Sequence, residues 1–262
     1  MNSGTTHNKP RQYFGQHFLH DQNIIDLILR AINPLPGDNL VEIGPGQGAL
    51  TYPLLQRCKD MIAIELDRDL VPVLQSESKR YGNLEVINAD ILEFNLASLG
   101  KDKKFRLLGN LPYNISTPLM FHVLESMSQI EDMHFMVQKE VGLRIVAGPG
   151  NNNYGRLSVM LQYRCECQYL FDVGPGSFSP PPKVDSAVVR MTPLTEPLHD
   201  IGDEKIFSAI VQAAFGQRRK TISNSLKSQV SRESISACGI DPSLRAENLS
   251  IGDFAKLSRA CS

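Results

Sequence analysis

The sequence lacks both a long apolar run and a paired-cysteine motif. No uncharged apolar stretch approaches the roughly 20 residues that a membrane-spanning helix needs, and the first residues, MNSGTTHNKPRQYFGQ, contain no apolar segment of a secretory signal. The five cysteines are an odd number without C-x-x-C spacing, which fits a reducing compartment better than a disulfide framework. We therefore expect a cytoplasmic protein that has no membrane anchor and binds no metal.

The sequence also lacks an excess of either charge, internal repeats and low-complexity tracts. Its net charge is −1, with 42% apolar and 21% charged residues, which is near the average for folded globular proteins. These values disfavour disordered, fibrous and membrane classes. A chain of 262 residues is long enough for one large domain, or for a large and a small one.

Positive charge is nevertheless concentrated near the end of the chain. From residue 201 onward nine Lys and Arg stand against six Asp and Glu, so this part carries +3 and the remainder −4. The stretch QRRKTISNSLK holds most of that excess, at Arg218, Arg219, Lys220 and Lys227. Alone, such a run is more often a solvated helix face, and it gains meaning only if the rest of the chain indicates a polyanionic partner.

Strand and helix patterns alternate along the first two thirds of the chain. Asp21 is placed to cap the first helix, Ser116 or Thr117 to cap the fourth, and Pro72 to break the third. We predict strands at 39–44, 61–66, 84–90, 105–110 and 133–139, and helices at 22–32, 49–58, 68–80 and 116–127.

Strands separated by helices of this length imply parallel pairing through right-handed crossovers, and therefore an open, doubly wound α/β sheet. Two later strands, 165–173 and 185–192, lie closer together and are expected to pair antiparallel at one edge. A proline-containing linker follows, and the remaining segments have helical patterns: 205–215, 219–229, 232–239 and 250–261. We predict a larger α/β domain over 1–195 and a small α-helical domain over 196–262.

A glycine turn and two acids follow the first three of these strands. The turn EIGPGQG contains Gly44 and Gly46, and glycine there allows a close backbone approach to a ligand at a helix N-terminus. Glu65 ends the second strand, where it could accept both hydroxyls of a ribose, and Asp90 ends the third, within reach of an adenine edge. Each alone is weak, since turns also use these residues. Together they favour S-adenosylmethionine, whose sulfonium suits acidic strand ends, over a dinucleotide.

The segment GNLPYN follows the fourth strand and suits methylation of an exocyclic amine. The lone pair of such an amine is delocalised into the ring, so acceptors aimed at both N–H protons would raise its nucleophilicity. Asn110 offers its side-chain oxygen, a carbonyl of Leu111 or Pro112 offers another, and Tyr113 could stack on the base. No strong general base is needed, because the methylated nitrogen is cationic and loses a proton readily.

A second aromatic face is expected from Phe178, in the proline-stiffened segment SFSPPPKVDS. Flipping a base out of a duplex costs a few kcal/mol, and stacking returns about 1–3 kcal/mol per base. A proline-rich turn with a core phenylalanine is the alternative explanation.

The motifs FGQHFL, VEIGPGQGALT, IELDRD, NADIL, GNLPYNISTPL, YGRLSVM and FSPPPKVDSAVVR resemble, in this order, those of the ribosomal RNA adenine N6,N6-dimethyltransferases, specifically the bacterial enzymes of small-subunit (16S) rRNA. The resemblance runs from about Arg11 through the helical tail. It implies a Rossmann-like class I methyltransferase sheet and S-adenosyl-L-methionine as methyl donor. The implied reaction dimethylates two adjacent adenosines in a hairpin loop near the 3′ end of 16S rRNA, within the small (30S) ribosomal subunit or its precursor. We expect a monomer, although the sequence does not determine the oligomeric state.

Site residues are carried over position by position. The resemblance implies that the cofactor contacts His17, Leu19, Gly44, Gly46, Glu65, Asp90 and Asn110. It implies an acceptor pocket formed by Asn110, Leu111, Pro112, Tyr113 and Phe178. It also implies that the C-terminal helices face the RNA, with phosphate contacts best placed at Arg218, Arg219 and Lys220.

Two other functions stay open on the sequence. The protein could be a small-subunit assembly factor that acts mainly by binding, with methylation secondary. It could instead methylate adenine in DNA or a glutamine amide, since such enzymes use related Asn-Pro-Tyr pockets, although the helical tail and triple proline argue against this.

Overall fold

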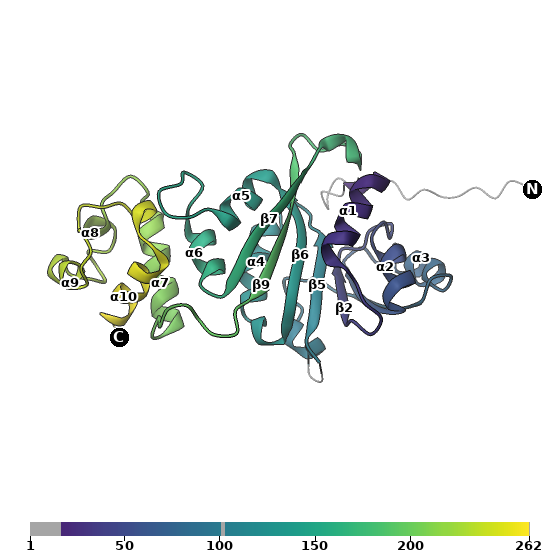
Figure 1. Ribbon diagram of the computed structural model, residues 1–262, viewed down its shortest axis with the longest axis horizontal. Helices are drawn as coiled ribbons and strands as arrows, with labels where there is room; N and C mark the ends of the chain where they lie inside the picture. The colour runs from purple at the N-terminus through teal and green to yellow at the C-terminus, as the bar shows by residue number, and fades with distance from the viewer. Residues whose placement is uncertain (1–16, 101–102, 262) are drawn as a thin grey trace, which may run out of the picture.

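Strands and helices alternate along most of the chain in the computed structural model, which describes residues 17–100 and 103–261 (Figure 1). The strands are β1 (Phe18–Leu19), β2 (Leu40–Ile43), β3 (Asp60–Glu65), β4 (Asn83–Asn88), β5 (Phe105–Asn110), β6 (Ile130–Gln138), β7 (Cys165–Val173), β8 (Phe178–Ser179) and β9 (Ser186–Pro193). The α-helices are α1 (Gln22–Ile32), α2 (Thr51–Cys58), α3 (Val71–Ser78), α4 (Ser116–Leu124), α5 (Lys139–Val146), α6 (Arg156–Gln162), α7 (Glu204–Gly216), α8 (Ile222–Ser225), α9 (Arg232–Ala237) and α10 (Ile251–Arg259).

The main sheet has seven strands in the order β4-β3-β2-β5-β6-β9-β7. Strands β2 to β6 are parallel, and β9 pairs antiparallel with both β6 and β7, which confirms the predicted parallel sheet with an antiparallel pair at one edge. The order reverses between β2 and β5, which is where open α/β sheets bind their ligands. A second sheet, β1 with β8, was not predicted, because two-residue strands carry no alternation.

Alternate residues of the strands point into two separate apolar cores. Leu40 and Leu108 pack with α1, α2 and α3, whereas their neighbours Val41 and Leu107 pack with α4, α5 and α6. A strand turns successive side chains to opposite faces, so a strand that is buried throughout needs helices on both sides. The sheet is accordingly covered on both faces, as the doubly wound prediction requires.

The helix starts agree with the sequence in one case and differ in two. Asp21 caps α1, accepting from the backbone nitrogen of Asn23 at 2.9 Å, as predicted. Ser116 does not cap α4: it is the first helical residue, and its hydroxyl donates to the carbonyl of Pro112 at 3.1 Å. Pro72 does not break α3, because the helix begins at Val71 and proline fits its first turn.

Three helical segments differ from the sequence patterns. Helices α5 and α6 were not predicted; α5 follows directly after β6, so the apolar run of the strand hides where the helix begins. The stretch 219–229 was expected to be one helix, but only Ile222–Ser225 is helical. Its backbone instead forms a bridge between Thr221 and Arg245.

The C-terminal helices lie at the opposite end of the molecule from α1–α3 (Figure 1). They pack on α6 and the turn after it: the ring of Tyr163 lies 5.1 Å from that of Phe207, and Arg164 donates to Glu204 at 3.0 Å. The apolar core is continuous from the sheet into these helices. The division at residues 195 and 196 therefore stays a prediction, although segment 194–203 between β9 and α7 contains the proposed boundary.

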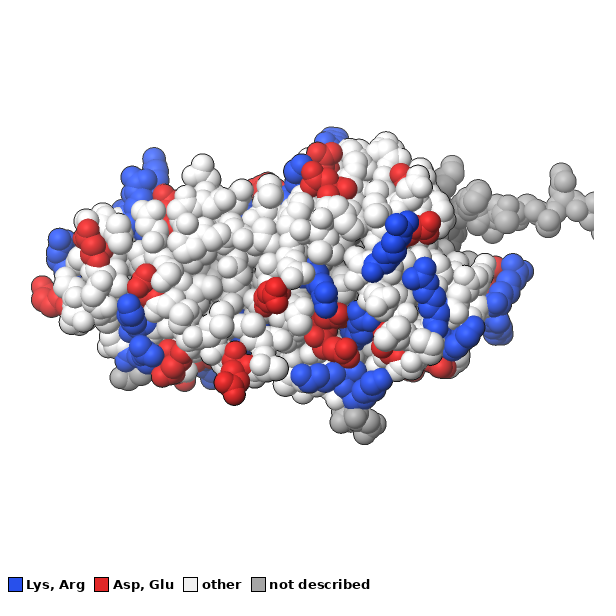
Figure 2. Space-filling model, in the orientation of Figure 1, with Lys and Arg blue, Asp and Glu red and all other residues white. Residues whose placement is uncertain are grey.

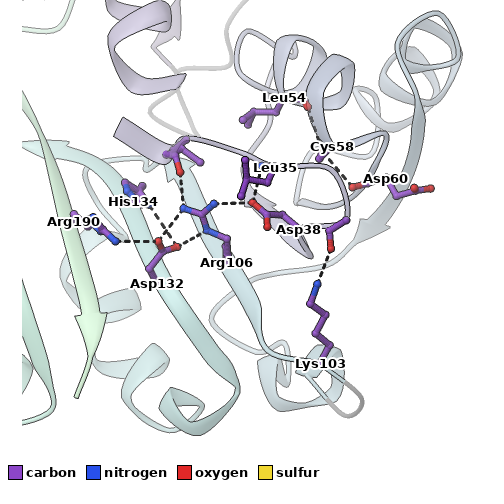
Figure 3. Close-up of polar contacts among 12 residues, drawn as sticks. Leu35, Asp38, Leu54, Cys58, Asp60, Lys103, Arg106, Asp132, His134 and Arg190 are labelled. Carbon is purple, nitrogen blue, oxygen red and sulfur yellow. Dashed lines mark hydrogen bonds and ion pairs between the residues drawn. The ribbon is translucent and has the colours of Figure 1, made fainter. Parts of the chain in front are cut away.

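A buried arginine ties the amino ends of the central strands together (Figure 3). Arg106, the second residue of β5, donates to both carboxylate oxygens of Asp132 on β6 at 3.0 and 2.9 Å, to Asp38 at 2.8 Å and to the carbonyl of Ile32 at 2.6 Å. Burial lowers the pKa of the neighbouring His134 to about 4, so this imidazole is neutral at pH 7. The network stabilises the amino-terminal ends of β5 and β6, opposite the ends at which ligands of such sheets bind.

Candidate active site

A cavity of about 380 Å³ opens at the carboxyl ends of β2, β3, β4 and β5, at the point where the strand order reverses. Its volume lies within the range of small-molecule sites. The cavity brings together all the predicted cofactor and acceptor residues except Phe178: His17, Leu19, Gly44, Gly46, Glu65, Asp90, Asn110, Leu111, Pro112 and Tyr113.

The glycine turn forms one wall and has a backbone that favours glycine. Gly44 and Gly46 have φ angles of 64° and 56°, in the left-handed region. A Cβ on Gly44 would meet nothing within 4 Å, so this residue leaves open space on the cavity side, whereas a Cβ on Gly46 would lie 3.2 Å from the ring of Phe18. A side chain at Gly44 would therefore occupy space that a ligand could use.

Glu65 is held by backbone donors on both oxygens. Its Oε1 accepts from the nitrogen of Asp67 at 2.8 Å and its Oε2 from that of Gly46 at 3.2 Å. Burial raises the pKa of this carboxyl above its ordinary value, and these hydrogen bonds oppose the rise. A carboxylate has about four acceptor sites, so Glu65 can still accept from a ligand hydroxyl beside these backbone donors.

Asp90 lies two residues beyond β4, where it shapes a turn at the cavity edge. Its Oδ1 accepts from the nitrogen of Leu92 at 2.9 Å. Leu66, which is 50% exposed, and Ile91 line the same part of the cavity. Sequence reasoning gave these two apolar residues no role, although each directly follows one of the predicted acids.

Glu42 is an acidic cavity residue to which the sequence analysis assigned no function. It lies within β2 and is 2% exposed, and its Oε2 accepts from the hydroxyl of Thr51 at 2.6 Å. Burial raises its pKa to about 7; the Thr51 hydrogen bond opposes this rise and the charge of Glu65 adds to it. The signal in the sequence was a lone carboxylate inside the apolar strand NLVEIG.

Asn110 ends β5 and is oriented by the N-terminal segment. Its side-chain nitrogen donates to the carbonyl of His17 at 3.0 Å. Next to it, the nitrogen of Leu111 donates to Met136 at 3.0 Å. The carbonyl of Pro112 already accepts from Ile115 and Ser116, both at 3.1 Å, whereas that of Leu111 has no donor within residues 17–100 and 103–261.

Tyr113 is half-buried, and both ends of its side chain are constrained. Its hydroxyl lies 2.8 Å from the hydroxyl of Ser186, a buried residue at the start of β9. The tyrosine ring lies 5.7 Å from the ring of His17, tilted by 31°. Burial raises the pKa of Tyr113, so the phenol is neutral at pH 7.

Phe178 is not brought into the cavity. It is 2% exposed, pairs in β8 with Leu19 and packs in the core with α1–α3. Its neighbour Ser179 pairs with Phe18, a cavity residue, so the proline-rich segment lies beside the cavity although Phe178 itself does not line it. The predicted stacking role of Phe178 stays a prediction.

The predicted phosphate-binding residues lie on the C-terminal part, away from the cavity. Arg218 donates through one nitrogen to the carbonyls of Asn152 and Tyr154, both at 2.9 Å, so it joins the turn after α7 to the loop before α6. Arg219 and Lys220 are exposed, and neither forms an ion pair within the described residues. Figure 2 shows basic side chains at both ends of the visible face.

In the part of the chain that the structure describes, no group of three or more His, Cys, Asp or Glu side chains is arranged to hold a metal ion. No helix there has the length and apolar character needed to cross a membrane. The five cysteines are free thiols.

The family model and the relatives that match this chain are all described as enzymes that methylate ribosomal RNA. Residues 7–261 match the family model described as "Ribosomal RNA adenine dimethylase". A relative from Pseudomonas aeruginosa, named "Ribosomal RNA small subunit methyltransferase A", is 51% identical over 251 residues, which cover 95% of this chain and 94% of the relative. A protein of the same name from Alcanivorax borkumensis is also 51% identical over 251 residues, with 95% and 89% covered.

Two solved structures are similar over nearly the whole chain. A dimethyladenosine transferase from Plasmodium falciparum superposes with a TM-score of 0.77 at 27% identity, covering 92% of this chain and 96% of that one. The 23S rRNA methyltransferase ErmE superposes with a TM-score of 0.73 at 26% identity, covering 93% and 99%. The similarity thus includes the C-terminal helices as well as the sheet.

Proposed function

The chain belongs to the ribosomal RNA adenine dimethylase family, and from that premise we propose that it transfers methyl groups from S-adenosylmethionine to the N6 amines of two adjacent adenosines in a hairpin loop near the 3′ end of 16S rRNA. Membership confirms the predicted fold class, a Rossmann-like class I methyltransferase sheet. The observation that carries the proposal is the position of Asn110 at the strand-order reversal, in one cavity with the glycine turn and the acids.

The cavity fits the proposed methyl donor. Gly44 leaves open space where a side chain would stand, and Glu42, Glu65 and Asp90 surround that space with carboxyl groups. Glu65 suits ribose hydroxyls, because its oxygens are fixed in place and retain lone pairs. When bound, S-adenosylmethionine supplies an electrophilic methyl group on a cationic sulfur. Acidic walls favour such a cation over the pyrophosphate of a dinucleotide.

The residues of the NLPY segment would activate the acceptor amine. Asn110 has its side-chain nitrogen engaged by His17, which leaves its oxygen to accept one proton of the amine. Of the two carbonyls considered for the other proton, Leu111 is better suited, because Pro112 already accepts two hydrogen bonds. Two acceptors on the amine oppose delocalisation of its lone pair, and no stronger base is required.

Tyr113 would stack on the acceptor base, since its ring lines the cavity and its hydroxyl is fixed by Ser186. Stacking on one aromatic ring is worth about 1–3 kcal/mol. A second face from Phe178 requires that ring to leave the core in which it is buried. In this conformation Tyr113 can therefore stack on one face of the base, while Phe178 does not reach the other face.

The small subunit is the proposed partner because the relatives at about half identity carry its name, whereas the relative named for 23S rRNA is only 26% identical. Arg219 and Lys220 are the residues best suited to phosphate, because they are exposed and free of ion pairs among the described residues. Arg218 is engaged with backbone carbonyls and is a weaker candidate than the sequence implied. A cytoplasmic, monomeric protein stays a prediction.

The test uses unmethylated small subunits, free 16S rRNA and free 23S rRNA, each incubated with labelled S-adenosylmethionine. Nucleoside mass analysis should find N6,N6-dimethyladenosine in RNA from the small-subunit and 16S samples and not in 23S rRNA. Product in 23S rRNA, or label in protein or DNA added as competitor, would overturn the substrate assignment.

Two variants separate transfer from cofactor binding. Asn110→Ala should abolish methyl transfer while largely retaining affinity for S-adenosylmethionine, because it removes the amine acceptor and leaves Gly44, Glu65 and Asp90 in place. Glu65→Ala should weaken that affinity, measured by calorimetry, because it removes the ribose acceptor. Turnover of Asn110→Ala at the wild-type rate would refute its role. No observation favours the alternative of an assembly factor that acts mainly by binding.

A further inference from the structure

Residues 17–20, which we call the strap, contribute His17, Phe18 and Leu19 to the lining of the cavity. Phe18 and Leu19 pair in β1 with Ser179 and Phe178 of β8, and the nitrogen of His20 donates to Ser177 at 3.0 Å. Leu19 is buried in the core. The backbone of the strap is therefore fixed along one side, so groups on its other side have defined positions.

His17 makes three contacts from the end of the strap. Its carbonyl accepts from the side-chain nitrogen of Asn110 at 3.0 Å. Its Nδ1 lies 2.7 Å from the carbonyl of Pro180, and since a carbonyl only accepts, Nδ1 carries the proton and donates. Its ring lies 5.7 Å from that of Tyr113. One residue thus joins the amide, the tyrosine and the proline-rich segment.

The contact with the His17 carbonyl decides which way the Asn110 amide points. The terminal torsion of asparagine is broad and nearly two-fold, so nothing within the side chain distinguishes the nitrogen from the oxygen. If the amide were reversed, its oxygen would face the carbonyl oxygen of His17 at about the same 3.0 Å, which is repulsive. The reversed amide would also present N–H donors to the N–H protons of an acceptor amine, and no hydrogen bond could form.

We propose that His17 is a positioning residue for methyl transfer: its main-chain carbonyl orients the Asn110 amide so that Oδ1 faces the acceptor amine, and its imidazole, anchored on Pro180, holds that carbonyl in place. This inference rests on the proposed function and goes beyond a cofactor contact at His17. It assigns the strap to the acceptor side of the reaction.

The test compares His17→Leu, which loses the Nδ1 donor, with His17→Asn, whose side-chain nitrogen occupies a similar position and can donate to Pro180. His17→Leu should lower kcat about ten-fold or more at saturating cofactor and RNA, with affinity for S-adenosylmethionine changed less than about three-fold. His17→Asn should restore most of kcat. His20→Leu is the matched control, since His20 is exposed on the same strap and should behave as wild type.

A rise in the Kd for S-adenosylmethionine with kcat preserved would overturn the proposal, because that is the signature of a cofactor contact. If wild type transfers no methyl group to any RNA, the proposed function fails instead. If wild type is inactive, or if His17→Leu does not fold, the orientation of the Asn110 amide can still be tested on wild type without measuring turnover. The side-chain amide of Asn110, assigned in 15N spectra by its absence from Asn110→Ala, should exchange slowly in wild type, and fast exchange refutes the orientation.

Discussion

Glu42 should make the stability of the protein depend on pH. Its pKa is about 7 in the folded state, against an ordinary value of 4.5, because burial disfavours the charged form. The folded state thus binds this proton more tightly than the unfolded chain does. The protonated carboxyl therefore adds to the free energy of unfolding; this contribution is fully present below pH 4.5 and is lost as pH rises through 7. From linkage, the free energy of unfolding should fall by roughly 2–3 kcal/mol between pH 5 and pH 8 through this residue alone.

Glu42→Gln isolates this contribution, because glutamine keeps an acceptor for Thr51 and does not titrate. Urea denaturation of wild type and variant at pH 5 and pH 8 gives the difference in unfolding free energy at each pH. The unfolding free energy of the variant should rise by roughly 2–3 kcal/mol relative to that of wild type on going from pH 5 to pH 8. Glu85→Gln, on the exposed side of β4, is the control. A relative change below about 0.5 kcal/mol for Glu42→Gln would refute a neutral buried carboxyl.

Three further changes test other parts of the molecule. Arg106→Leu should cost about 3–5 kcal/mol in urea denaturation, because the buried Asp132 loses two hydrogen bonds and keeps the longer Arg190 contact at 3.6 Å; a loss below about 1 kcal/mol contradicts this. Ser186→Ala should lower kcat about three- to ten-fold without changing cofactor affinity, since Tyr113 loses its anchor, and an equal effect in a Tyr113→Phe background would disprove it. Lys220→Ala should reduce the salt slope of small-subunit binding by about one, and an unchanged slope excludes a phosphate contact.

Polar residues at strand ends made much of the site predictable from the sequence. Glu65 and Asn110 each follow a buried apolar run, and the carboxyl ends of parallel strands meet at one edge of a sheet, so the sequence order alone brings them together. The glycine turn follows from the same rule. These predictions needed only local patterns and the handedness of the crossovers.

What was missed depends on contacts between distant parts of the chain. The burial of Phe178 follows from pairing with Leu19, about 160 residues earlier, through strands too short to show a pattern. Arg218 looked like a free cation in its basic run, yet it donates to the loop at Asn152. The raised pKa of Glu42 depends on the burial of its side chain in the folded protein, which no local pattern reveals.

The strap has a consequence for when the enzyme becomes competent during its synthesis. The glycine turn, both acids and Asn110 leave the ribosome first, yet the partner of β1 arrives only with Phe178 and Ser179. A nascent chain that ends before β8 already contains most of the methyl-donor wall but lacks the β8 pairing and the Pro180 carbonyl that fix the strap along its other side. Competence for transfer therefore comes late in translation, after the last third of the polypeptide has begun to emerge.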